Sequence, residues 1–226
     1  GWSTSSVNES YSDNGGVTWS SPKELITSAF SNFSTLLKGN AIRMEHHFFS
    51  LPAYNEFIDK SGLFITLSPQ GDITQLTRMT WNGGNLQPFV IPLSKKHALA
   101  FYRCSSISPK TIFSNHTEDS GRHWSKATPT PLPNPDSAFF ALRSQSKIIM
   151  LYNNQTTGRT NLSIAASNIA DINKWKVLYT LPNPKHTGLA YPYLITFMNQ
   201  PYFALSAGEG QQEIKLYRIN LRKQQK

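Results

Sequence analysis

The sequence predicts an all-β fold, and three observations support this prediction. Aromatic residues make up 12% of the chain while hydrophobic residues of all kinds reach only 38%, a balance that suits many short, half-buried strands. Short apolar runs recur along the 226 residues, and little between them has a helical period. An eight-residue motif, Ser12–Trp19 (SDNGGVTW), returns as Thr117–Trp124 (TEDSGRHW) with the same spacing, which indicates a repeating unit.

Strands are expected at the apolar runs, most of them in pairs joined by tight turns. The expected ranges are 2–8, 20–26, 40–44, 47–54, 62–68, 73–81, 87–94, 97–104, 110–116, 124–128, 137–143, 147–153, 161–167, 175–181, 190–198, 201–206 and 213–221. The pairs that start near Asn40, Gln87, Ser137 and Tyr191 resemble one another and lie about fifty residues apart. A repeat of that length with four antiparallel strands is typical of a β-propeller blade. The chain is therefore expected to hold half a blade, three full blades and a last blade of three strands.

Each copy of the eight-residue motif is expected to close a hairpin between the third and fourth strands of a blade. The motif positions are Ser12, Asn14, Gly16 and Trp19 in the first copy and Thr117, Asp119, Gly121 and Trp124 in the second. The Asn or Asp accepts hydrogen bonds from its own turn, the glycine takes a positive φ, and the tryptophan folds back as a hydrophobic plug. Ser68–Asp72 and Ser167–Trp175 are degenerate copies. Neither good copy combines a nucleophile with a base, so the motif is expected to be structural.

Composition excludes several classes of function. The single cysteine, Cys104, excludes an intramolecular disulfide and a cysteine-based zinc site, and we expect a buried, inert thiol. The formal net charge of +9 suits an anionic partner, but Lys and Arg are scattered except in the tail 218–226, so no nucleic-acid partner is expected. His46 and His47 have no third ligand nearby in sequence, so neither a metal nor another cofactor is predicted.

The compartment is left open by the sequence. No run of eighteen apolar residues predicts a membrane span, and no signal peptide is recognisable. Five Asn-x-Ser/Thr sequons, at Asn8, Asn32, Asn115, Asn154 and Asn161, are too easily produced by chance to decide it. A secreted or periplasmic location is slightly favoured, and a monomer is expected.

Several short motifs resemble those of sialidases and their relatives, the BNR-repeat propellers. Ser-x-Asp-x-Gly-x-Thr-Trp is the Asp-box of that superfamily, and it is accompanied here by LPNPDS at 132–137, Tyr152-Asn153, RTNL at 159–162, Tyr191-Pro192 and LQP at 86–88. The resemblance covers nearly the whole chain. It implies a six-bladed β-propeller of which residues 1–226 form a single domain of about four to five blades, the first blade and part of the second lying outside this sequence.

Blade geometry sorts the polar residues by face. Connections from the second strand to the third, and from the fourth to the next blade, lie on the face opposite the Asp-boxes, where a site is expected. The polar residues on that face are Asn55, Glu56, Gln87, Arg103, Asn134, Asp136, Asn153, Arg159, Tyr191 and Glu209. An arginine fork binds a carboxylate through two parallel hydrogen bonds, so an acidic sugar such as sialic acid is the expected partner.

The resemblance to sialidases implies individual roles. Arg103 and Arg159 resemble two of the family's three carboxylate-binding arginines, and Tyr191 resembles its nucleophile, which attacks as a phenol that a base deprotonates and gives retention through a covalent intermediate. Gln87 stands where the family's glutamate base is expected, and an amide cannot act as a base. Glu56 or Glu209 is a candidate replacement, and Gln87, Asn55, Asn153 and Asp136 are candidate substrate-binding residues.

Two functions therefore stay open. The first is a sialidase-like glycoside hydrolase, and because the family's acid/base aspartate and first arginine belong to the first blade, this chain alone is expected to be inactive. The second, favoured by Gln87, is a lectin-like propeller that binds glycans without hydrolysis. Structural roles also stay open: Arg103 in an ion pair, Arg159 as a brace of its loop, Tyr191 in packing, and Asn134 and Asp136 in a turn.

Overall fold

The computed structural model describes residues 4–27, 33–45, 49–57, 60–81, 83–105, 108–198 and 200–218. They divide into two compact units, Gly1–Ile107 with Phe113–Thr128, and Ser108–Ile112 with Pro129–Lys226. The histidine pair 46–47 and the tail beyond residue 218 lie outside the described residues. The expectation of a single domain over residues 1–226 stays a prediction.

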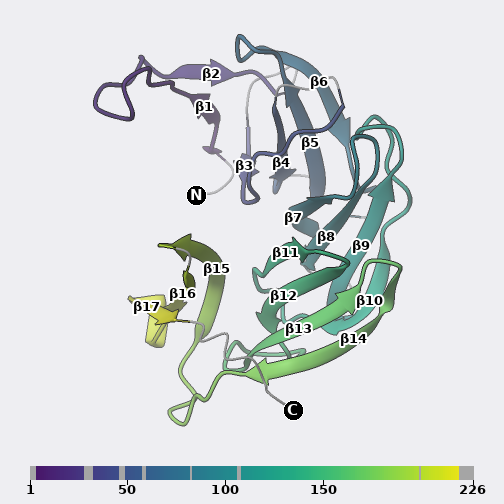
Figure 1. The fold of residues 1–226 in the computed structure, drawn as a ribbon, viewed down its shortest axis with the longest axis vertical. Helices are drawn as coiled ribbons and strands as arrows, with labels where there is room; N and C mark the ends of the chain where they lie inside the picture. Colours follow the sequence, from purple (N-terminus) through teal and green to yellow (C-terminus); the bar gives the residue numbers. More distant parts are fainter. Residues whose placement is uncertain are drawn as a thin grey trace. The chain divides into compact units, whose positions relative to one another are not determined.

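Five antiparallel sheets account for the described strands, which confirms the all-β prediction (Figure 1). The first sheet pairs β1 (Val7–Glu9) with β2 (Lys23–Leu25). Three sheets have four strands each: β3 (Thr35–Leu37), β4 (Phe49–Asn55), β5 (Ser61–Leu67) and β6 (Ile73–Arg78); β7 (Asn85–Pro92), β8 (Ala98–Cys104), β9 (Thr111–Thr117) and β10 (Thr128–Pro133); β11 (Phe140–Ser144), β12 (Lys147–Asn153), β13 (Leu162–Asn168) and β14 (Asp171–Thr180). The last has β15 (Leu189–Phe197), β16 (Gln200–Ala207) and β17 (Glu213–Arg218), with the short 3-10 helix η2 (Glu209–Gln211) before β17.

In every sheet the strands follow one another in chain order, so each sheet is a simple meander. This is the arrangement expected of a propeller blade, whose strands are joined by short connections between neighbours. The sheet of three strands at the end and the sheet of two strands at the beginning also follow the sequence prediction.

Two of the expected strands are displaced. The range 40–44 holds only an isolated bridge between Ile42 and Ser50, and the first strand of that sheet is β3, five residues earlier. The sequence predicts a strand over 124–128, whereas β10 begins at Thr128 and runs through three prolines. Proline is tolerated there because β10 is an outer strand, where a missing backbone N–H breaks no ladder bond on the open side.

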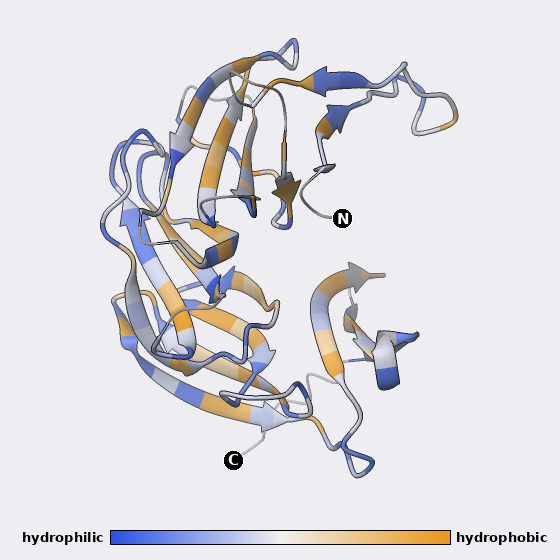
Figure 2. Ribbon diagram, turned by 180° about the vertical axis from the view of Figure 1, so that it is seen from behind, coloured by the Kyte–Doolittle hydropathy of each residue, from blue (hydrophilic) through white to orange (hydrophobic). Residues whose placement is uncertain are grey.

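Hydrophobic residues are concentrated in the strands and hydrophilic residues in the connections (Figure 2). In the first unit, one buried cluster contains Phe64, Met79, Tyr102 and Cys104, and Cys104 is fully buried, as expected. Gly62 lies directly against the Tyr102 ring, since a Cβ at Gly62 would come within 2.7 Å of it. The strands that carry the candidate site are thus held by a close-packed core.

Candidate functional site

The first strand of four of the five sheets has an unusual backbone at or near its start. The φ values are 59° at Ser34, 52° at Gln87, 60° at Asp136 and 51° at Tyr191. Ser34 and Asp136 lie before β3 and β11, and Gln87 and Tyr191 are the third residues of β7 and β15. Positive φ is sterically costly for residues other than glycine, and such strain is concentrated at functional sites in proteins. Three of these four residues, all except Ser34, are candidate site residues from the sequence.

Gln87 and Tyr191 occupy matching positions in their sheets. In the sheet of β7 the pairing passes from Leu86↔Arg103 to Phe89↔Phe101, and in the sheet of β15 it passes from Ala190↔Ser206 to Tyr193↔Ala204. Each shift leaves a two-residue bulge, Gln87-Pro88 or Tyr191-Pro192. Bulges next to active sites re-aim a side chain. The same backbone device therefore presents an amide in one sheet and a phenol in the other.

The two side chains differ in exposure. Gln87 is 6% exposed, and its Nε2 donates to the Tyr54 hydroxyl at 3.4 Å while its Oε1 has no hydrogen-bond partner among the described residues. Asn85, two residues earlier on β7, is also buried with an unpaired Oδ1. Tyr191, by contrast, is 38% exposed. A buried acceptor without a donor is costly, so Gln87 and Asn85 are places where a ligand or a water would complete the bonding.

Arg103 lies near the end of β8 and is half-buried. Its register partner is Leu86, the residue before Gln87, so the guanidinium and the amide start from the same end of one sheet. Sequence reasoning selected both residues, and the structure brings their backbones together within the first unit.

Asn55 and Glu56 follow the end of β4 in the same unit. The Asn55 side chain is engaged on both sides, because its Nδ2 donates to the Phe33 carbonyl at 3.0 Å and its Oδ1 accepts from the Phe57 amide at 2.9 Å. The Glu56 amide donates to the Ser34 carbonyl and hydroxyl, each at 3.3 Å. These bonds hold the loop beside β3, and they leave the half-buried Glu56 carboxyl as the part of this segment that can meet a ligand.

Arg159 and Asp136 are brought together in the second unit. The Arg159 Nη2 donates to the Asp136 carbonyl at 2.8 Å, and the Arg159 carbonyl accepts from the Leu189 amide at 2.6 Å. One side of this arginine thus supports the strained turn at Asp136, and its backbone supports the start of β15, two residues before Tyr191. Arg159 can brace this turn and bind a ligand at the same time, because a guanidinium has five N–H donors and the Asp136 carbonyl accepts from only one nitrogen.

Asn153 and Asn134 are structural in this geometry. Asn153 is fully buried, and it accepts from the Ser137 hydroxyl at 2.6 Å and donates to the carbonyls of Asn161 and Leu189. Asn134 is also buried, and it bonds the Ser137 amide and carbonyl. The Asn153 amide ties the end of β12 to Ser137, before β11, and to Leu189, at the start of β15, whereas the Asn134 amide closes the turn 134–137. Asn153 thus helps to position the strand that carries Tyr191.

A tyrosine is repeated near the end of the second strand of each four-stranded sheet, and the sequence motifs above include only one copy of it, Tyr152. Tyr54, Tyr102 and Tyr152 each precede a candidate residue, Asn55, Arg103 or Asn153, and all three are at most 5% exposed. Burial raises the pKa of the Tyr152 phenol to about 12 and raises the pKa of Tyr102 well above its ordinary value, although a hydrogen bond to Asn115 opposes the latter. The phenols of Tyr102 and Tyr152 therefore stay protonated at neutral pH. The dipeptides Tyr-Asn, Tyr-Arg and Tyr-Asn at about fifty-residue spacing are the signal that could have found them.

The remaining sequence expectations concern metals, membranes and the Asp-boxes. Within the described ranges, no group of three or more His, Cys, Asp or Glu side chains is arranged to hold a metal ion. No helix in the described part of the chain has the length and apolar character needed to cross a membrane. The second Asp-box has its tryptophan packed on Phe64, whereas Trp19 of the first box is 65% exposed and does not form the expected hydrophobic plug.

Known proteins with this arrangement of strands are found at low sequence identity. The family model described as BNR repeat-like domain matches residues 1–205. The NanB sialidase of Streptococcus pneumoniae superposes with a TM-score of 0.68 at 16% identity, over 93% of this chain and 34% of its own. A Dyadobacter fermentans protein of unknown function gives 0.70 at 13% identity, over 94% and 63%. The Trypanosoma rangeli sialidase, solved in complex with sialic acid, gives 0.59 at 10%, over 96% and 38%.

These likenesses establish an all-β, propeller-like fold. The chain spans about a third of the length of the pneumococcal sialidase that it resembles. No curated protein matches the chain at the level of sequence.

Proposed function

This chain belongs to the BNR repeat-like domain family and shares its fold with sialidases, and from that premise we propose that it is a sialidase-like protein that recognises an acidic sugar through Arg103 and Arg159. The proposed reaction is hydrolysis of the glycosidic bond of that sugar, with Tyr191 as nucleophile. A domain completed to six blades remains part of the same proposal.

The observation that carries the proposal is the backbone at Tyr191. A half-exposed tyrosine at a φ of 51° is held in a bulge two residues beyond Leu189, whose amide bonds the Arg159 carbonyl. A fold stores strain of this kind where a side chain must be presented in one orientation. Arg159 and Tyr191 therefore meet the requirement that the binding group and the reacting group be held by one rigid frame.

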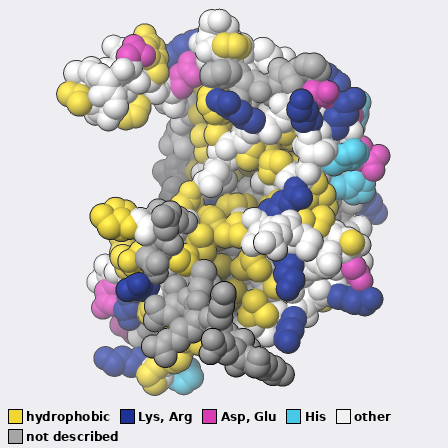
Figure 3. Space-filling model, viewed as in Figure 1, with side chains coloured by type: hydrophobic (Ala, Val, Ile, Leu, Met, Phe, Trp, Pro, Cys, Tyr) yellow, Lys and Arg dark blue, Asp and Glu magenta, His cyan; other side chains and the backbone are white. Residues whose placement is uncertain are grey.

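Arginine is the side chain that suits the acidic group of the sugar. A guanidinium donates two parallel hydrogen bonds to a carboxylate, and it keeps its charge at every relevant pH. Arg159 is already oriented by its bond to the Asp136 carbonyl, which lowers the entropic cost of fixing the side chain on binding. Among the described residues that Figure 3 draws, Lys and Arg side chains are interspersed with side chains of other kinds, which favours recognition by single arginines over a diffuse basic surface.

A phenol suits a substrate that carries its own carboxylate. A carboxylate nucleophile would be repelled by the substrate, whereas a neutral phenol avoids this repulsion until a base removes its proton. In the proposed step the Tyr191 oxygen bonds to the anomeric carbon, the glycosidic C–O bond breaks, the phenol proton goes to a base, and the leaving oxygen takes a proton from an acid. Water then cleaves the tyrosyl intermediate with retention.

A second candidate function is glycan binding without hydrolysis, and Gln87 favours it. The amide stands at the position where the sialidase resemblance implies a glutamate base, and it is buried against Tyr54. Without a base that takes its proton, the phenol of Tyr191 is a weak nucleophile and reacts slowly. Glu56 and Glu209 are the candidate replacements for the missing carboxylate.

The binding proposal is tested by titrating N-acetylneuraminic acid into this chain. Arg159→Lys keeps the charge but loses the planar fork, so we expect affinity to fall by about tenfold or more. The matched control is Arg122→Lys, an exposed arginine of the second Asp-box, which should bind as the wild type does. Equal affinity for galactose, or full affinity in Arg159→Lys, contradicts acidic-sugar recognition by this residue.

Turnover separates the two candidates. A fluorogenic sialoside is offered to the full natural chain that carries these residues and to its Tyr191→Phe variant. A hydrolase loses activity in the variant, while a lectin shows none in either protein and keeps its affinity for the sugar. Hydrolysis that persists in Tyr191→Phe rules out the proposed nucleophile.

A further inference from the structure

A pocket of about 240 Å³ lies in the second unit, where β13 is followed by β14. It is formed around Ser167–Trp175, a degenerate copy of the Asp-box. Lys147, which lines it, is the first residue of β12, whereas Asn153 is the last, so the pocket lies at the end of the sheet away from Asn153 and Arg159. Its lining residues are Lys147, Ala166, Ser167, Asn168, Lys174, Trp175, Lys176 and Leu178.

The degenerate box differs from the two good boxes on both sides of its tryptophan. The good boxes have Thr-Trp-Ser at 18–20 and His-Trp-Ser at 123–125, whereas this copy has Lys-Trp-Lys at 174–176. The turn is held by Ser167, whose hydroxyl lies within hydrogen-bond distance of the Asp171 and Lys174 carbonyls, at 2.8 and 2.7 Å. This copy of the box therefore keeps an ordered turn and adds two positive charges to it.

The walls of the pocket are fixed by further hydrogen bonds. The Ile169 amide donates to the Ser146 carbonyl at 2.9 Å, which ties this turn to the residue before Lys147. The Trp175 Nε1 donates to the Ile172 carbonyl at 2.7 Å and so orients the half-buried ring. These bonds organise the pocket before any ligand arrives, which reduces the entropic cost of binding.

Two of the lysines project from the same face of the sheet. Lys147 is paired with Asn168, and Lys176 is paired with Ala166, which lies two residues from Asn168 on β13. Side chains at alternate positions of a strand, and those of directly paired residues, lie on one face. The two ammonium groups therefore start from one side of the sheet and can reach a single group bound in the pocket.

The charges around the pocket do not balance. The Lys174 Nζ pairs with the Asp171 carboxyl at 3.0 Å. Lys147 and Lys176 form no ion pair within the described part of the chain, and no carboxylate is among the described residues that line the pocket. Ammonium groups that gather without a counter-charge repel one another. An anion with two negative charges in the pocket would remove this repulsion.

The lining matches a phosphate group attached to a ring. A phosphate monoester carries close to two negative charges at neutral pH, and lysine is a common phosphate ligand. The Asn168 Oδ1 accepts from the Ala170 amide at 2.9 Å, which leaves its Nδ2 group to donate to a phosphate oxygen. The fixed Trp175 ring, together with Leu178, offers an apolar surface against which a flat ring can pack.

We propose that this pocket binds a phosphate monoester, with the phosphate group between Lys147 and Lys176 and the ring that carries it against Trp175. The site is distinct from the acidic-sugar site of the proposed function and does not depend on it. The degenerate Asp-box thus has a binding role, in contrast to the structural role of the two good boxes.

The ligand chemistry is tested by titration calorimetry on the full natural chain that carries these residues. The probes are phenyl phosphate, phenyl sulfate, which has the same ring but one negative charge, and inorganic phosphate, which has no ring. We expect phenyl phosphate to bind about tenfold more tightly than either of the others. Equal affinity for phenyl sulfate, or no binding of phenyl phosphate, overturns the proposal.

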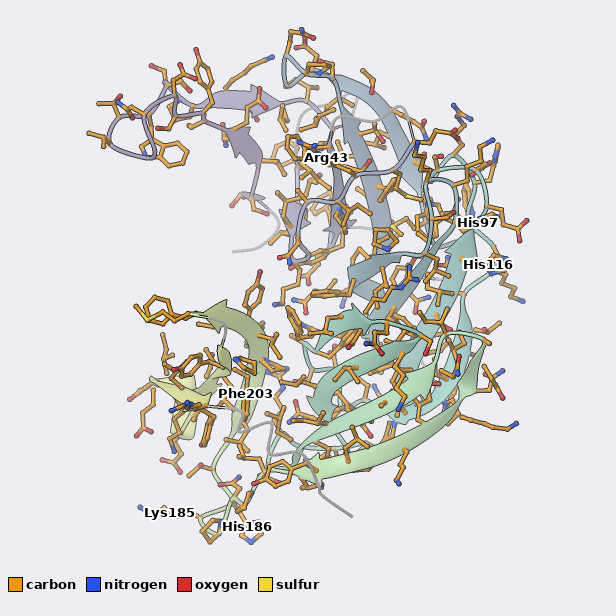
Figure 4. All side chains as sticks on the ribbon, viewed as in Figure 1. Arg43, His97, His116, Lys185, His186 and Phe203 are labelled. Carbon is orange, nitrogen blue, oxygen red and sulfur yellow. The ribbon has the colours of Figure 1, made fainter. Side chains whose placement is uncertain are left out.

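The position of the site is tested by removing one charge at a time. Lys176→Met keeps an apolar side chain but loses the ammonium group, so we expect the affinity for phenyl phosphate to fall about tenfold. The matched control is Lys185→Met, an exposed lysine in the connection from β14 to β15 of the same unit that does not line this pocket (Figure 4). Equal weakening in both variants would assign the binding to the overall positive charge and overturn the site.

The ring contact is tested by Trp175→Leu, which should lower the affinity for phenyl phosphate to that for inorganic phosphate. Lys147→Met guards against a failure of Trp175→Leu to fold, and it should weaken phenyl phosphate binding about tenfold, as Lys176→Met does. Full affinity for phenyl phosphate in both lysine variants contradicts the site.

Two cross-measurements separate this site from the proposed function. Arg159→Lys should bind phenyl phosphate as the wild type does, and Lys176→Met should leave the affinity for N-acetylneuraminic acid unchanged. Loss of phenyl phosphate binding in Arg159→Lys would place the probe at the acidic-sugar site and overturn the phosphate pocket. Absence of N-acetylneuraminic acid binding, with phenyl phosphate binding that depends on Lys176, refutes the acidic-sugar proposal and supports the pocket.

Discussion

The two Asp-boxes have nearly the same hydrogen bonds and very different surroundings. In the first, Gly16 donates to the Ser12 hydroxyl at 2.8 Å and Thr18 donates to the Asn14 side chain at 2.9 Å. In the second, Gly121 donates to the Thr117 hydroxyl at 3.0 Å and His123 donates to the Asp119 side chain at 2.9 Å. Gly16 and Gly121 have φ values of 89° and 88°. The turn is therefore specified by its own eight residues.

The surroundings of the two boxes diverge. Trp124 packs edge-on against Phe64 with centroids 5.5 Å apart, and Ser120 bonds the carbonyls of Lys95 and Lys96 in the neighbouring turn. In the first box, the side chains of Ser12 and Asn14 bond residues of the box itself, and Trp19 is 65% exposed, with Nε1 bonded to the Gly16 carbonyl. Local hydrogen bonds therefore build the turn, whereas the sheet beside it decides whether the tryptophan stabilises the fold.

The largest difference in unfolding free energy is expected between alanine substitutions of the two box glycines, Gly121 and Gly16. A Cβ at Gly121 would overlap the Phe64 ring, while a Cβ at Gly16 meets only the Trp19 ring at 3.7 Å. Gly121→Ala combines backbone strain with overpacking and should cost about 3–4 kcal/mol of unfolding free energy, against about 1–2 kcal/mol for Gly16→Ala. Urea unfolding of the two variants measures both values. Equal costs would mean that the Phe64 side chain moves aside freely.

The tryptophans should differ next. Trp124→Ala removes a ring packed against a buried cluster and is expected to destabilise by about 2–3 kcal/mol. Trp19→Ala removes an exposed ring and should cost less than about 1 kcal/mol. Thermal unfolding of the pair checks this order, and a larger loss in Trp19→Ala would show that the first box is covered in solution.

The smallest effect concerns the acidic position of the boxes. Burial raises the pKa of the Asp119 carboxyl, but hydrogen bonds from the His123 amide and ring and from Thr117 lower it more, so its pKa lies below the ordinary value. A depressed pKa gives stability that is present above about pH 4 and is lost as the pH falls through the folded-state pKa. The carboxyl is 35% exposed and solvent screens it, so the contribution stays under about 1 kcal/mol.

The two boxes allow reciprocal substitutions, because the first box has Asn14 at the position that Asp119 holds in the second. Asp119→Asn should keep the turn and remove part of the loss of stability below about pH 4. Asn14→Asp should add such a dependence to the first box. Unfolding curves recorded between pH 3 and pH 7 measure both. A variant with an unchanged acid dependence would show that other carboxyl groups account for it.

The sequence is sufficient to predict most of the strands, but it does not correctly place two outer strands, β3 and β10. Alternating apolar runs and tight turns predict the strands because those signals are local. The sequence places β10 too early because its three prolines resemble a break in a strand. Proline fits this strand only because β10 lies at the edge of its sheet, and the sequence does not show that position. β3 was missed because it is only three residues long, too short for a periodic signal.

The candidate site is also only partly predictable from the sequence. Residue type and spacing select Arg103, Arg159 and Tyr191, but the positive φ at Gln87 and Tyr191 depends on the register of two paired strands, which no local pattern encodes. The burial of Asn153 depends on three segments that meet only in the folded chain. Sequence reasoning therefore finds groups capable of chemistry more readily than it separates groups that touch a ligand from groups that position them.

The most direct measurement of the central claim is a crystal structure of the full natural chain with N-acetylneuraminic acid bound. We expect the sugar carboxylate to accept hydrogen bonds from the guanidinium groups of Arg103 and Arg159, and the Tyr191 phenol to face the anomeric carbon. A sugar bound elsewhere, or a carboxylate that meets neither arginine, would contradict it.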